Sequence, residues 1–596
     1  MSKRIFALLL ALLLCLSTLL SFASCGEEKP KDDGKQNGEQ ENGNTTVPSG
    51  SGNPSTTTPS GSNSSTPSNP SNPGGSQQTN PPASSEVNFP NEPTAGLEYR
   101  LNGDETAYTL VGKGSAKAEE LAYLHIASVY EGLPVTAIAA NAFNGCTDLK
   151  AVKLPTSIAA IGSQAFRGCS NLVALFIDDL TAWCEIEFED RALYYGADLY
   201  VKNNRLTELV IPEGLTEIKA YSFCRITSIT SVTVGSGVTA IGKGAFYGCT
   251  GLTAVNLPAH RLALDGNPFS DSGLPCEADG SLYVGEYLLR ASSSETAYSI
   301  KAGTKYICDD AFFSCSMPSV NIPASVTFVA KNAFRECSGL ESVNITDIGA
   351  WCNIEFEYDP EDLYRYFPTE QAEKLTLNSA AITELTVPEG VNKIPPFAFS
   401  SCKELTRVSI PNSVTEIGDY AFADCGTLGA VTFGTQSQLR RIGTGAFGYY
   451  DEGYCEQLAT FDIPDSVTSI GHGAFPYCEK IITVVDRVEY IDGWAVGLDD
   501  SQSSRYTIAE GTVGLSDGVL LAAGTYGNAS RFTLPVSLKY IGSKVITKQI
   551  GTSRIQITYA GTVEQWNAIQ KAGDWLTGSG YEESIVCVDG TIGYQG

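Results

Sequence analysis

The feature that most constrains this chain is a phrase of about 23 residues that recurs along most of its length. Phe143 and Phe166 lie 23 residues apart in two successive copies, and Phe399 and Phe422 repeat that spacing much later. A fixed period of this length is typical of a solenoid, in which each coil buries its apolar side chains against its neighbours. The chain therefore needs no division into several globular domains, although it has 596 residues.

The order of residue types within each copy predicts its local structure. The stretch Leu405–Ile410 follows the pattern Leu-x-x-Val-x-Ile and alternates at its end, as a half-buried strand requires. Pro411 follows and cannot continue a hydrogen-bonded ladder. A second short extended piece is predicted at Val414–Gly418. The Ala-Phe-x-x-Cys segment after it is predicted to turn the corner with its phenylalanine pointing inward, so that stacked coils carry parallel strands and an apolar interior.

The complete phrase, IGxxAFxxCxxLxxVxIPxSV, resembles the repeat of the BspA-like leucine-rich repeat family of bacterial surface proteins. The resemblance covers about residues 95–596. It implies a mainly β repeat solenoid: a right-handed leucine-rich repeat stack of about 23-residue coils, with parallel strands and short helical insertions. Residues 93–134 are expected to form an N-terminal lead-in or cap and 135–485 the repeats. Residues 486–596 are expected to hold degenerate repeats and the cap that covers the last open coil.

The first 25 residues are predicted to be an export signal. Lys3 and Arg4 precede the almost wholly apolar stretch 5–22, and small residues follow it. The end of the stretch resembles a bacterial lipobox, which implies lipidation of Cys25 and anchoring to the membrane. Phe22 departs from the leucine that is usual in that motif. An uncleaved N-terminal anchor is the alternative, because the apolar stretch is near the lower limit for a membrane span.

Residues 26–92 are predicted to be a disordered linker. The segment consists mainly of Gly, Ser, Asn, Thr, Pro, Glu and Lys, with almost no large apolar side chain. Such a composition cannot bury enough surface to offset the entropy of ordering the chain. A flexible linker of this length spans about 45 Å. It is expected to present the folded part away from the membrane.

Eight of the 17 cysteines occupy one position of the repeat and are predicted to form a column inside the solenoid. Disulfides between coils are one interpretation for an exported protein. Buried free thiols acting as small apolar side chains are the other, and the demanding geometry of a disulfide favours them. The absence of a Cys-x-x-Cys pair argues against zinc. The eight are Cys146, Cys169, Cys249, Cys315, Cys337, Cys402, Cys425 and Cys478.

Three insertions place a tryptophan after a predicted strand, on what is expected to be a short helix. The favoured interpretation is that each tryptophan fills the coil interior, since its buried area is large. The alternative is an aromatic contact for a glycan or peptide, to which tyrosines such as Tyr194 and Tyr195 could add, because binding often resides in loops. The tryptophans are Trp183, Trp351 and Trp566.

Charge and motifs exclude several classes of function. The net charge is −28, with 67 acidic and 39 basic residues, so a nucleic-acid partner is not expected. The three histidines, His125, His260 and His472, stand far apart in unrelated contexts. No HExxH or phosphate-loop motif occurs. Glu185, Glu187 and Glu189 alternate along one predicted solvated face. We therefore expect no enzyme, no cofactor and no metal site.

The remaining hypotheses concern recognition at a cell surface. The resemblance implies an exported, lipid-anchored protein that binds a host or bacterial surface protein or a glycan. The expected binding residues are polar x positions of the predicted strands, namely Asn256, Asn344, Arg407 and Ser409. A structural envelope spacer without a specific ligand and a nutrient-capturing lipoprotein are the alternatives. Replacing strand-face residues distinguishes them, since a spacer tolerates such changes.

Overall fold

The computed structural model describes residues 87, 89–292, 296–359, 366–448, 454–499, 503, 505–520, 531–547, 555–577 and 583–594. The predicted signal peptide, Cys25 and nearly all of the predicted linker lie outside these residues. Among the described residues, no helix is both long and apolar enough to cross a membrane.

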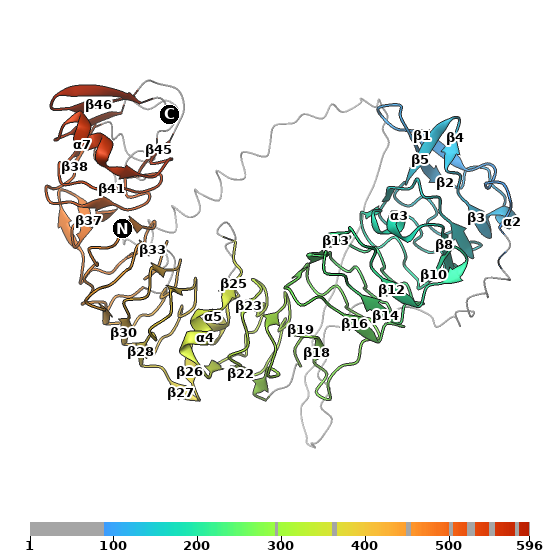
Figure 1. Ribbon diagram of the computed structural model, residues 1–596, viewed down its shortest axis with the longest axis horizontal. Coiled ribbons are helices and arrows are strands. Elements are labelled where there is room, and N and C mark those ends of the chain that lie inside the picture. The colour runs from blue at the N-terminus through green and yellow to red at the C-terminus, as the bar shows by residue number, and fades with distance from the viewer. Residues whose placement is uncertain are drawn as a thin grey trace, which may run out of the picture. The chain divides into compact units, whose positions relative to one another are not determined.

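The described chain is a solenoid whose coils each contribute a strand to a first column of parallel sheets (Figure 1). This confirms the predicted mainly β repeat fold. The Leu-x-x-Val-x-Ile stretches form this column, and its solvent-facing side is called the strand face below. Its strands are β3 (Tyr123–His125), β6 (Ala151–Lys153), β8 (Ala174–Ile177), β10 (Asp198–Val201), β12 (Glu208–Val210), β14 (Ser231–Thr233), β16 (Ala254–Asn256), β20 (Tyr298–Ser299), β22 (Ser319–Ile322), β24 (Ser342–Ile345), β26 (Leu375–Leu377), β28 (Glu384–Thr386), β30 (Arg407–Ile410), β32 (Ala430–Phe433), β38 (Arg505–Thr507), β40 (Arg531–Leu534), β43 (Gln556–Tyr559) and β46 (Glu583–Cys587).

The Val-x-x-Ile-Gly stretches form a second column of short, mostly two-residue strands, as predicted. These are β5 (Leu133–Ile138), β7 (Ala160–Ile161), β9 (Glu187–Phe188), β13 (Glu217–Ile218), β15 (Ala240–Ile241), β17 (Ala263–Leu264), β19 (Tyr287–Arg290), β21 (Tyr306–Ile307), β23 (Phe328–Val329), β25 (Glu355–Phe356), β29 (Lys393–Ile394), β31 (Glu416–Ile417), β33 (Arg441–Ile442), β34 (Ser469–Ile470), β37 (Trp494–Leu498), β39 (Gly514–Leu515), β41 (Tyr540–Ile541) and β44 (Gln570–Lys571). Strands of neighbouring coils pair in parallel, for example β29 with β31 and β31 with β33.

Antiparallel hairpins interrupt or close the two columns. At the N-terminal end β1 (Glu98–Leu101) pairs with β2 (Tyr108–Gly112), and β4 (Val129–Tyr130) pairs with β5. At the other end β46 pairs with β47 (Gly590–Tyr594), which forms the final strand of its sheet. The remaining elements are α2 (Ala118–Leu121), α5 (Pro368–Ala372), β11 (Asn204–Arg205), β18 (Leu282–Val284), β27 (Ala380–Ala381), β35 (Thr483–Val485), β36 (Val488–Ile491), β42 (Ile546–Thr547) and β45 (Leu576–Thr577).

The phenylalanines of the Ala-Phe corners stack on one another through the interior, as the period predicts. The Phe399 and Phe422 ring centroids are 5.5 Å apart with an interplanar angle of 9°. Phe422 stacks on Phe447 at 5.5 Å, and Phe447 on Phe475 at 5.2 Å. These rings are at most 3% exposed. Within a run of regular coils the same turn repeats, so each ring has the next one as its packing partner.

The glycine of Ile-Gly lies where two coils come closest. A Cβ at Gly418 would lie 2.6 Å from the Pro396 nitrogen, and one at Gly242 would lie 2.6 Å from the Ala220 nitrogen. Real Cβ atoms do not approach backbone this closely, so the spacing between coils requires glycine here. This explains why Ile-Gly is a fixed part of the repeat phrase.

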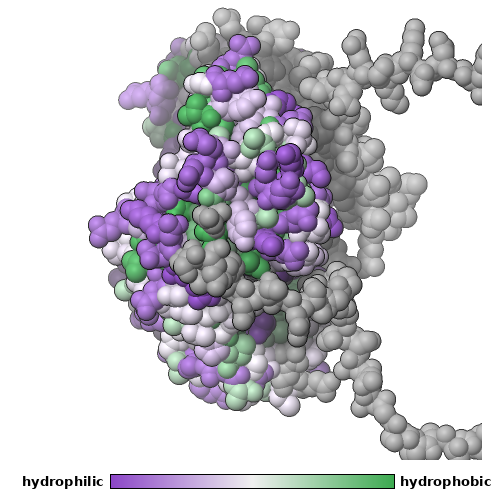
Figure 2. Space-filling view, turned by 90° about the vertical axis from the view of Figure 1, so that its right-hand side faces the viewer, coloured by the Kyte–Doolittle hydropathy of each residue, from purple (hydrophilic) through white to green (hydrophobic). Residues whose placement is uncertain are grey.

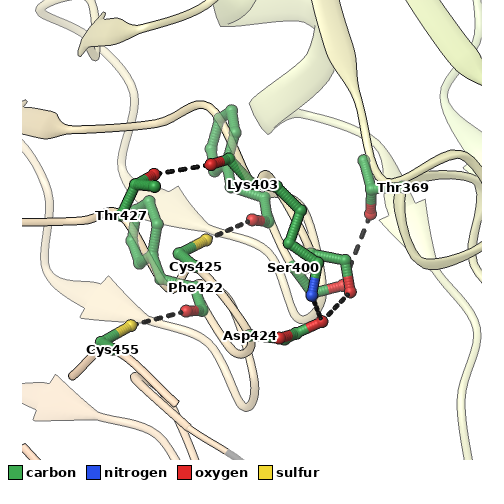
Figure 3. A network of polar contacts seen from close by, with 10 residues as sticks. Thr369, Ser400, Lys403, Phe422, Asp424, Cys425, Thr427 and Cys455 are labelled. Atoms are coloured by element: carbon green, nitrogen blue, oxygen red, sulfur yellow. Dashed lines mark hydrogen bonds and ion pairs between the residues drawn. The ribbon is translucent and has the colours of Figure 1, made fainter. Parts of the chain in front are cut away.

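The repeat cysteines are free thiols in the described residues, which confirms the favoured interpretation over inter-coil disulfides. The Cys425 sulfur donates to the Phe399 carbonyl oxygen of the preceding coil at 3.1 Å (Figure 3). Cys169 and Cys249 make the same bond with Phe143 and Phe223 at 3.1 and 3.0 Å. The side chain therefore fills a small space and also donates to a buried carbonyl oxygen of the neighbouring turn, which has two lone pairs.

Cys455 belongs to the same column, although the repeat pattern did not reveal it. Its sulfur donates to the Phe422 carbonyl oxygen at 3.3 Å (Figure 3). The insertion before it lengthens its coil, so its spacing from Cys425 is 30 residues rather than 23. Burial raises the pKa of Cys425 from 9.0 to about 12, so this thiol stays protonated and unreactive at neutral pH.

Two tryptophans of the insertions fill the coil interior, as favoured above, and each lies on a short capped helix. Asp179 accepts a hydrogen bond from the Ala182 nitrogen at the start of α3 (Leu180–Cys184). Trp183 is 3% exposed, and its indole nitrogen donates to the Ser222 carbonyl oxygen at 3.1 Å. Trp351, on α4 (Ile348–Cys352), donates in the same way to the Ala398 carbonyl oxygen at 2.9 Å. These bonds tie each helical insertion to a later coil.

The third tryptophan has the same position relative to its helix. Trp566 lies on α7 (Val563–Ala568), which begins with a capping box formed by Thr562 and Gln565. It is 4% exposed and packs against Tyr559 and Trp575, with ring centroids 5.3 and 5.7 Å away. The buried tryptophans leave no indole surface free for a ligand.

Replacing Gly418 by alanine is expected to destabilise the solenoid by about 2 kcal/mol, the usual range for forcing an extra carbon into a packed site. The measurement is chemical denaturation followed by circular dichroism. Gly235→Ala is the matched control, because no atom lies within 4 Å of the Cβ it would add. Equal stability of the two variants would show that the coils tolerate a wider spacing.

Thiol labelling at pH 8 is expected to separate the cysteines by burial. Cys276 is exposed and should react with iodoacetamide in the folded protein, whereas Cys425 should react only after unfolding. Peptide mapping by mass spectrometry locates the labelled residues. Fast labelling of Cys425 in the native protein, or a disulfide found at it, contradicts the buried-thiol column.

Candidate binding surface

The strand face carries two rows of outward side chains held in register by the parallel ladders. On β28, β30 and β32 one row is Glu384, Arg407 and Ala430. The intervening residue of β30, Val408, is fully buried, which fixes its two neighbours on the opposite side. Arg407 is exposed, and no described residue forms an ion pair with it. Its guanidinium group can therefore reach a ligand.

The second row on these strands consists of hydroxyl side chains. Thr386, Ser409 and Thr432 lie at matching positions on β28, β30 and β32. Ser409 is half-buried and Thr386 is exposed. The structure thus brings Arg407 and Ser409 together on one strand, pointing to the same side, as the alternation predicted.

Asn344 lies in a similar row on a different sheet, but both the nitrogen and the oxygen of its amide are hydrogen-bonded within the protein. Its nitrogen donates to the Asn321 side-chain oxygen at 2.9 Å. Its oxygen accepts from the Thr376 hydroxyl at 3.0 Å and from the Ser379 backbone nitrogen at 2.6 Å. Asn344 therefore ties β22, β24 and the turn between β26 and β27 together, which gives this predicted binding residue a structural role.

Asn256 is exposed at the end of a third sheet, β12-β14-β16. Its nitrogen donates only weakly, to the Thr233 hydroxyl at 3.4 Å. The four predicted residues thus occupy three sheets, and only Arg407 and Ser409 share a strand. Asn256 and Arg407 keep polar groups that a ligand can use.

The strand face is covered at its N-terminal end. Phe176 and Tyr200 stack at 4.5 Å on the outer side of β8 and β10, where later coils carry polar residues. Phe89 packs edge-on against Phe176 at 5.0 Å, and Val87 joins the same cluster. The His125 ring contacts the Pro90 carbonyl oxygen at 3.0 Å. The last part of the segment predicted as linker therefore lies on the solenoid, and the open strand face begins after β10.

Two arginines of the strand face were missed by sequence reasoning. Arg505 and Arg531 are in register on β38 and β40, and both are exposed. Thr507, Thr533 and Thr558 form the neighbouring row. The sequence does contain a repeated polar-apolar-Thr pattern that marks these strands. It reads Arg-Tyr-Thr, Arg-Phe-Thr and Gln-Ile-Thr at residues 505–507, 531–533 and 556–558. It was hidden because the period is irregular in this part of the chain.

A polar network at the corner turns is structural rather than a site (Figure 3). Lys403 pairs with Asp424 of the next coil, which also accepts from the Ser401 hydroxyl at 3.0 Å. The Thr427 hydroxyl donates to the Lys403 carbonyl oxygen at 2.7 Å. Each polar group in this network is satisfied by a neighbouring coil, so the network fixes the turns and presents no free group.

The three histidines and the glutamates around β9 contact structural partners or solvent. The His125, His260 and His472 rings each contact a backbone carbonyl oxygen, at 3.0, 2.7 and 3.2 Å. Glu185 and Glu189 are exposed on one side of the chain around β9, with Glu187 between them paired to Lys219. No group of three or more His, Cys, Asp or Glu residues in the described chain is arranged to hold a metal ion.

Comparison with known families agrees with the coil geometry. The family described as "BspA type Leucine rich repeat region" matches residues 126–194, 194–274, 282–355 and 373–496, in six copies. The matched residues make up more than half of the chain. The chain belongs to this family. No curated protein sequence matches it.

Solved structures with a similar course of the chain come from bacterial leucine-rich repeat proteins. A leucine rich cell surface protein from Faecalibacterium prausnitzii A2-165 is 20% identical, with 82% of this chain and 97% of that chain covered and a TM-score of 0.24. A leucine-rich repeat protein from Bacteroides ovatus ATCC 8483 is 18% identical, covering 81% and 98% of the two chains with a TM-score of 0.23. The pneumococcal vaccine antigen PcpA is 14% identical, covering 82% and 98% with a TM-score of 0.24. These similarities do not identify a ligand for the present protein.

Asn344→Ala is expected to destabilise the protein by about 2 kcal/mol, because it removes three hydrogen bonds of one network, including that to the buried Thr376. Arg407→Ala is the matched strand-face control and is expected to change stability by less than about 0.5 kcal/mol. Both values come from urea denaturation. A neutral Asn344→Ala would remove the structural role and restore this residue as a binding candidate.

Proposed function

We propose that this BspA-type protein is exported to the bacterial cell surface and there binds a protein or glycan through its strand face. The observation that carries the proposal is the exposed Arg407, which lies beside the hydroxyl row of Ser409 on a rigid ladder. Side chains fixed in register by parallel strands lose little further freedom on binding, which favours recognition. Extended repeat surfaces are also well suited to large partners.

The proposal includes the anchoring expected from the sequence. Cys25 would carry the lipid, and the linker that follows would hold the solenoid away from the membrane. The segment containing Phe89 is packed onto the first coils, so the flexible reach would end near residue 87. Radiolabelled palmitate incorporation into the wild-type chain but not into Cys25→Ala would support lipidation.

The strand-face test is a binding screen of residues 87–596 against host matrix proteins and a glycan array. A saturable ligand is expected to lose at least tenfold in affinity, about 1.4 kcal/mol, in Arg407→Ala. Lys393→Ala is the matched control, because Lys393 is also an exposed cation but lies on β29 of the second column. Its affinity should change by less than twofold.

Other outcomes would change the assignment. A well-folded fragment that binds none of the partners would favour the envelope spacer. Binding restricted to small nutrients, with no surface partner, would favour a nutrient-capturing lipoprotein. Equal losses in Arg407→Ala and Lys393→Ala would show that the interaction depends on overall charge and not on the strand face.

A further inference from the structure

A row of alternating arginines and tyrosines runs along the corner turns of the early coils, on a different surface from the strand face. Arg167 directly follows Phe166, the corner phenylalanine of one coil, and Tyr194 directly follows Leu193 in the next coil. Phe166 and Leu193 form a parallel β-bridge, which places Arg167 and Tyr194 on adjacent turns. Arg225 and Tyr247 continue the row, and the Arg225 nitrogen donates to the Tyr247 carbonyl oxygen at 2.6 Å. Backbone bonds between turns therefore fix the spacing of these side chains.

The guanidinium groups are held over the tyrosine rings. Arg167 and Arg225 both lie over Tyr194, at 5.9 and 6.0 Å from its centroid. Arg225 also lies 5.4 Å from the centroid of Tyr247, and Arg191 lies 5.0 Å from the same ring. Each ring is thus shared by two cations, and Arg225 links the two rings. Cation–π contacts of this kind position a guanidinium while leaving its N–H edges available.

The arginines are poorly compensated within a strongly acidic protein. The chain has a net charge of −28, yet these three cations lie on one corner surface. Asp190 approaches Arg191 at 3.9 Å, and both are at least a third exposed, so this pair is weak. Arg167 donates to the uncharged Gln164 side chain at 2.7 Å. Within the described chain, no carboxylate forms an ion pair with Arg167 or Arg225.

Tyrosine rings add an apolar surface between the charges. Tyr194 is 50% exposed even with two arginines above it, and Tyr195 packs edge-on against it at 5.3 Å. Burial, together with a hydrogen bond to Asp271, raises the pKa of Tyr247. Exposed aromatic rings beside fixed arginines are the composition of energetic centres in binding interfaces.

We propose that Arg167, Arg191 and Arg225 form a binding site for an acidic polysaccharide, with sulfate or carboxylate groups paired to the guanidinium groups and sugar rings on Tyr194 and Tyr195. A guanidinium fork matches both anions in two parallel hydrogen bonds. Arg167 and Arg225 lie two coils apart along the stacking direction, in which neighbouring strands are about 4.8 Å apart. A linear polymer with an anion on each repeating unit fits that arrangement. Exposed ring faces favour sugars over an acidic peptide.

The experiment measures binding of the full chain, solubilised in detergent, to immobilised heparin and hyaluronate. Neutral dextran and polyglutamate serve as comparison ligands. Heparin or hyaluronate should bind saturably, dextran should not, and the affinity should fall steeply with added salt. The triple variant R167Q/R191Q/R225Q should lose at least tenfold in affinity while its thermal unfolding stays that of the wild type.

The matched control is R100Q/K393Q/K539Q, which removes the same charge from exposed positions elsewhere. It should keep its affinity within twofold. Arg225→Lys keeps the charge but removes the planar fork, and it should lose affinity several-fold without unfolding, which distinguishes a binding role from a packing role.

The proposal is overturned if neither acidic polysaccharide binds, or if both triple variants lose affinity equally. Equal binding of polyglutamate would also overturn it and would point to an acidic protein segment as the partner. Because Arg407 is unchanged in all these variants, the result does not depend on the strand-face proposal, and either one can fail alone.

Discussion

Close stacking of one coil on the next is the constraint on which the rest of the structure depends. The corner phenylalanines stack at 4.5–5.6 Å, and this spacing leaves no room for a Cβ at the Ile-Gly glycine. The cysteine thiol donates to the phenylalanine carbonyl oxygen of the previous coil and so links the two turns. Ring, glycine and thiol therefore form one unit, and a change at any of them propagates to two neighbouring coils.

Because the interior is fixed by this unit, variation is confined to the outer surfaces. The strand face is aromatic and covered at β8 and β10, hydrogen-bonded internally at Asn344, and open at Arg407. At the N-terminal end the described surface has hydrophobic residues only in small groups among hydrophilic and neutral ones (Figure 2). A face of this kind is suited to contacts made through polar and charged side chains. This agrees with a recognition role in which arginines carry the specificity.

The two outer surfaces have different physical characters. On the strand face, side chains stand in register on flat ladders, and their neighbours are mostly hydroxyls. On the corner surface, arginines and tyrosines hold one another through ring contacts, and the only ion pair of these three cations within the described residues is the weak one between Arg191 and Asp190. A chain with this negative charge gains most from such fixed cations when its partner is itself acidic, because the surrounding protein repels acidic molecules elsewhere.

The sequence by itself determined the period, the inward phenylalanines, the two strands of each coil and the thiol column. These depend on contacts that repeat identically, so one copy predicts them all. Only the tertiary structure decided which polar residues are free. Asn344 and Asn256 occupy equivalent positions in the repeat, yet Asn344 is bonded by β22 and by the turn after β26, whereas Asn256 ends its sheet. The Arg167–Tyr194–Arg225 row was likewise invisible in the sequence, because an insertion separates its members by 27 and 31 residues and only stacking of the coils brings them together.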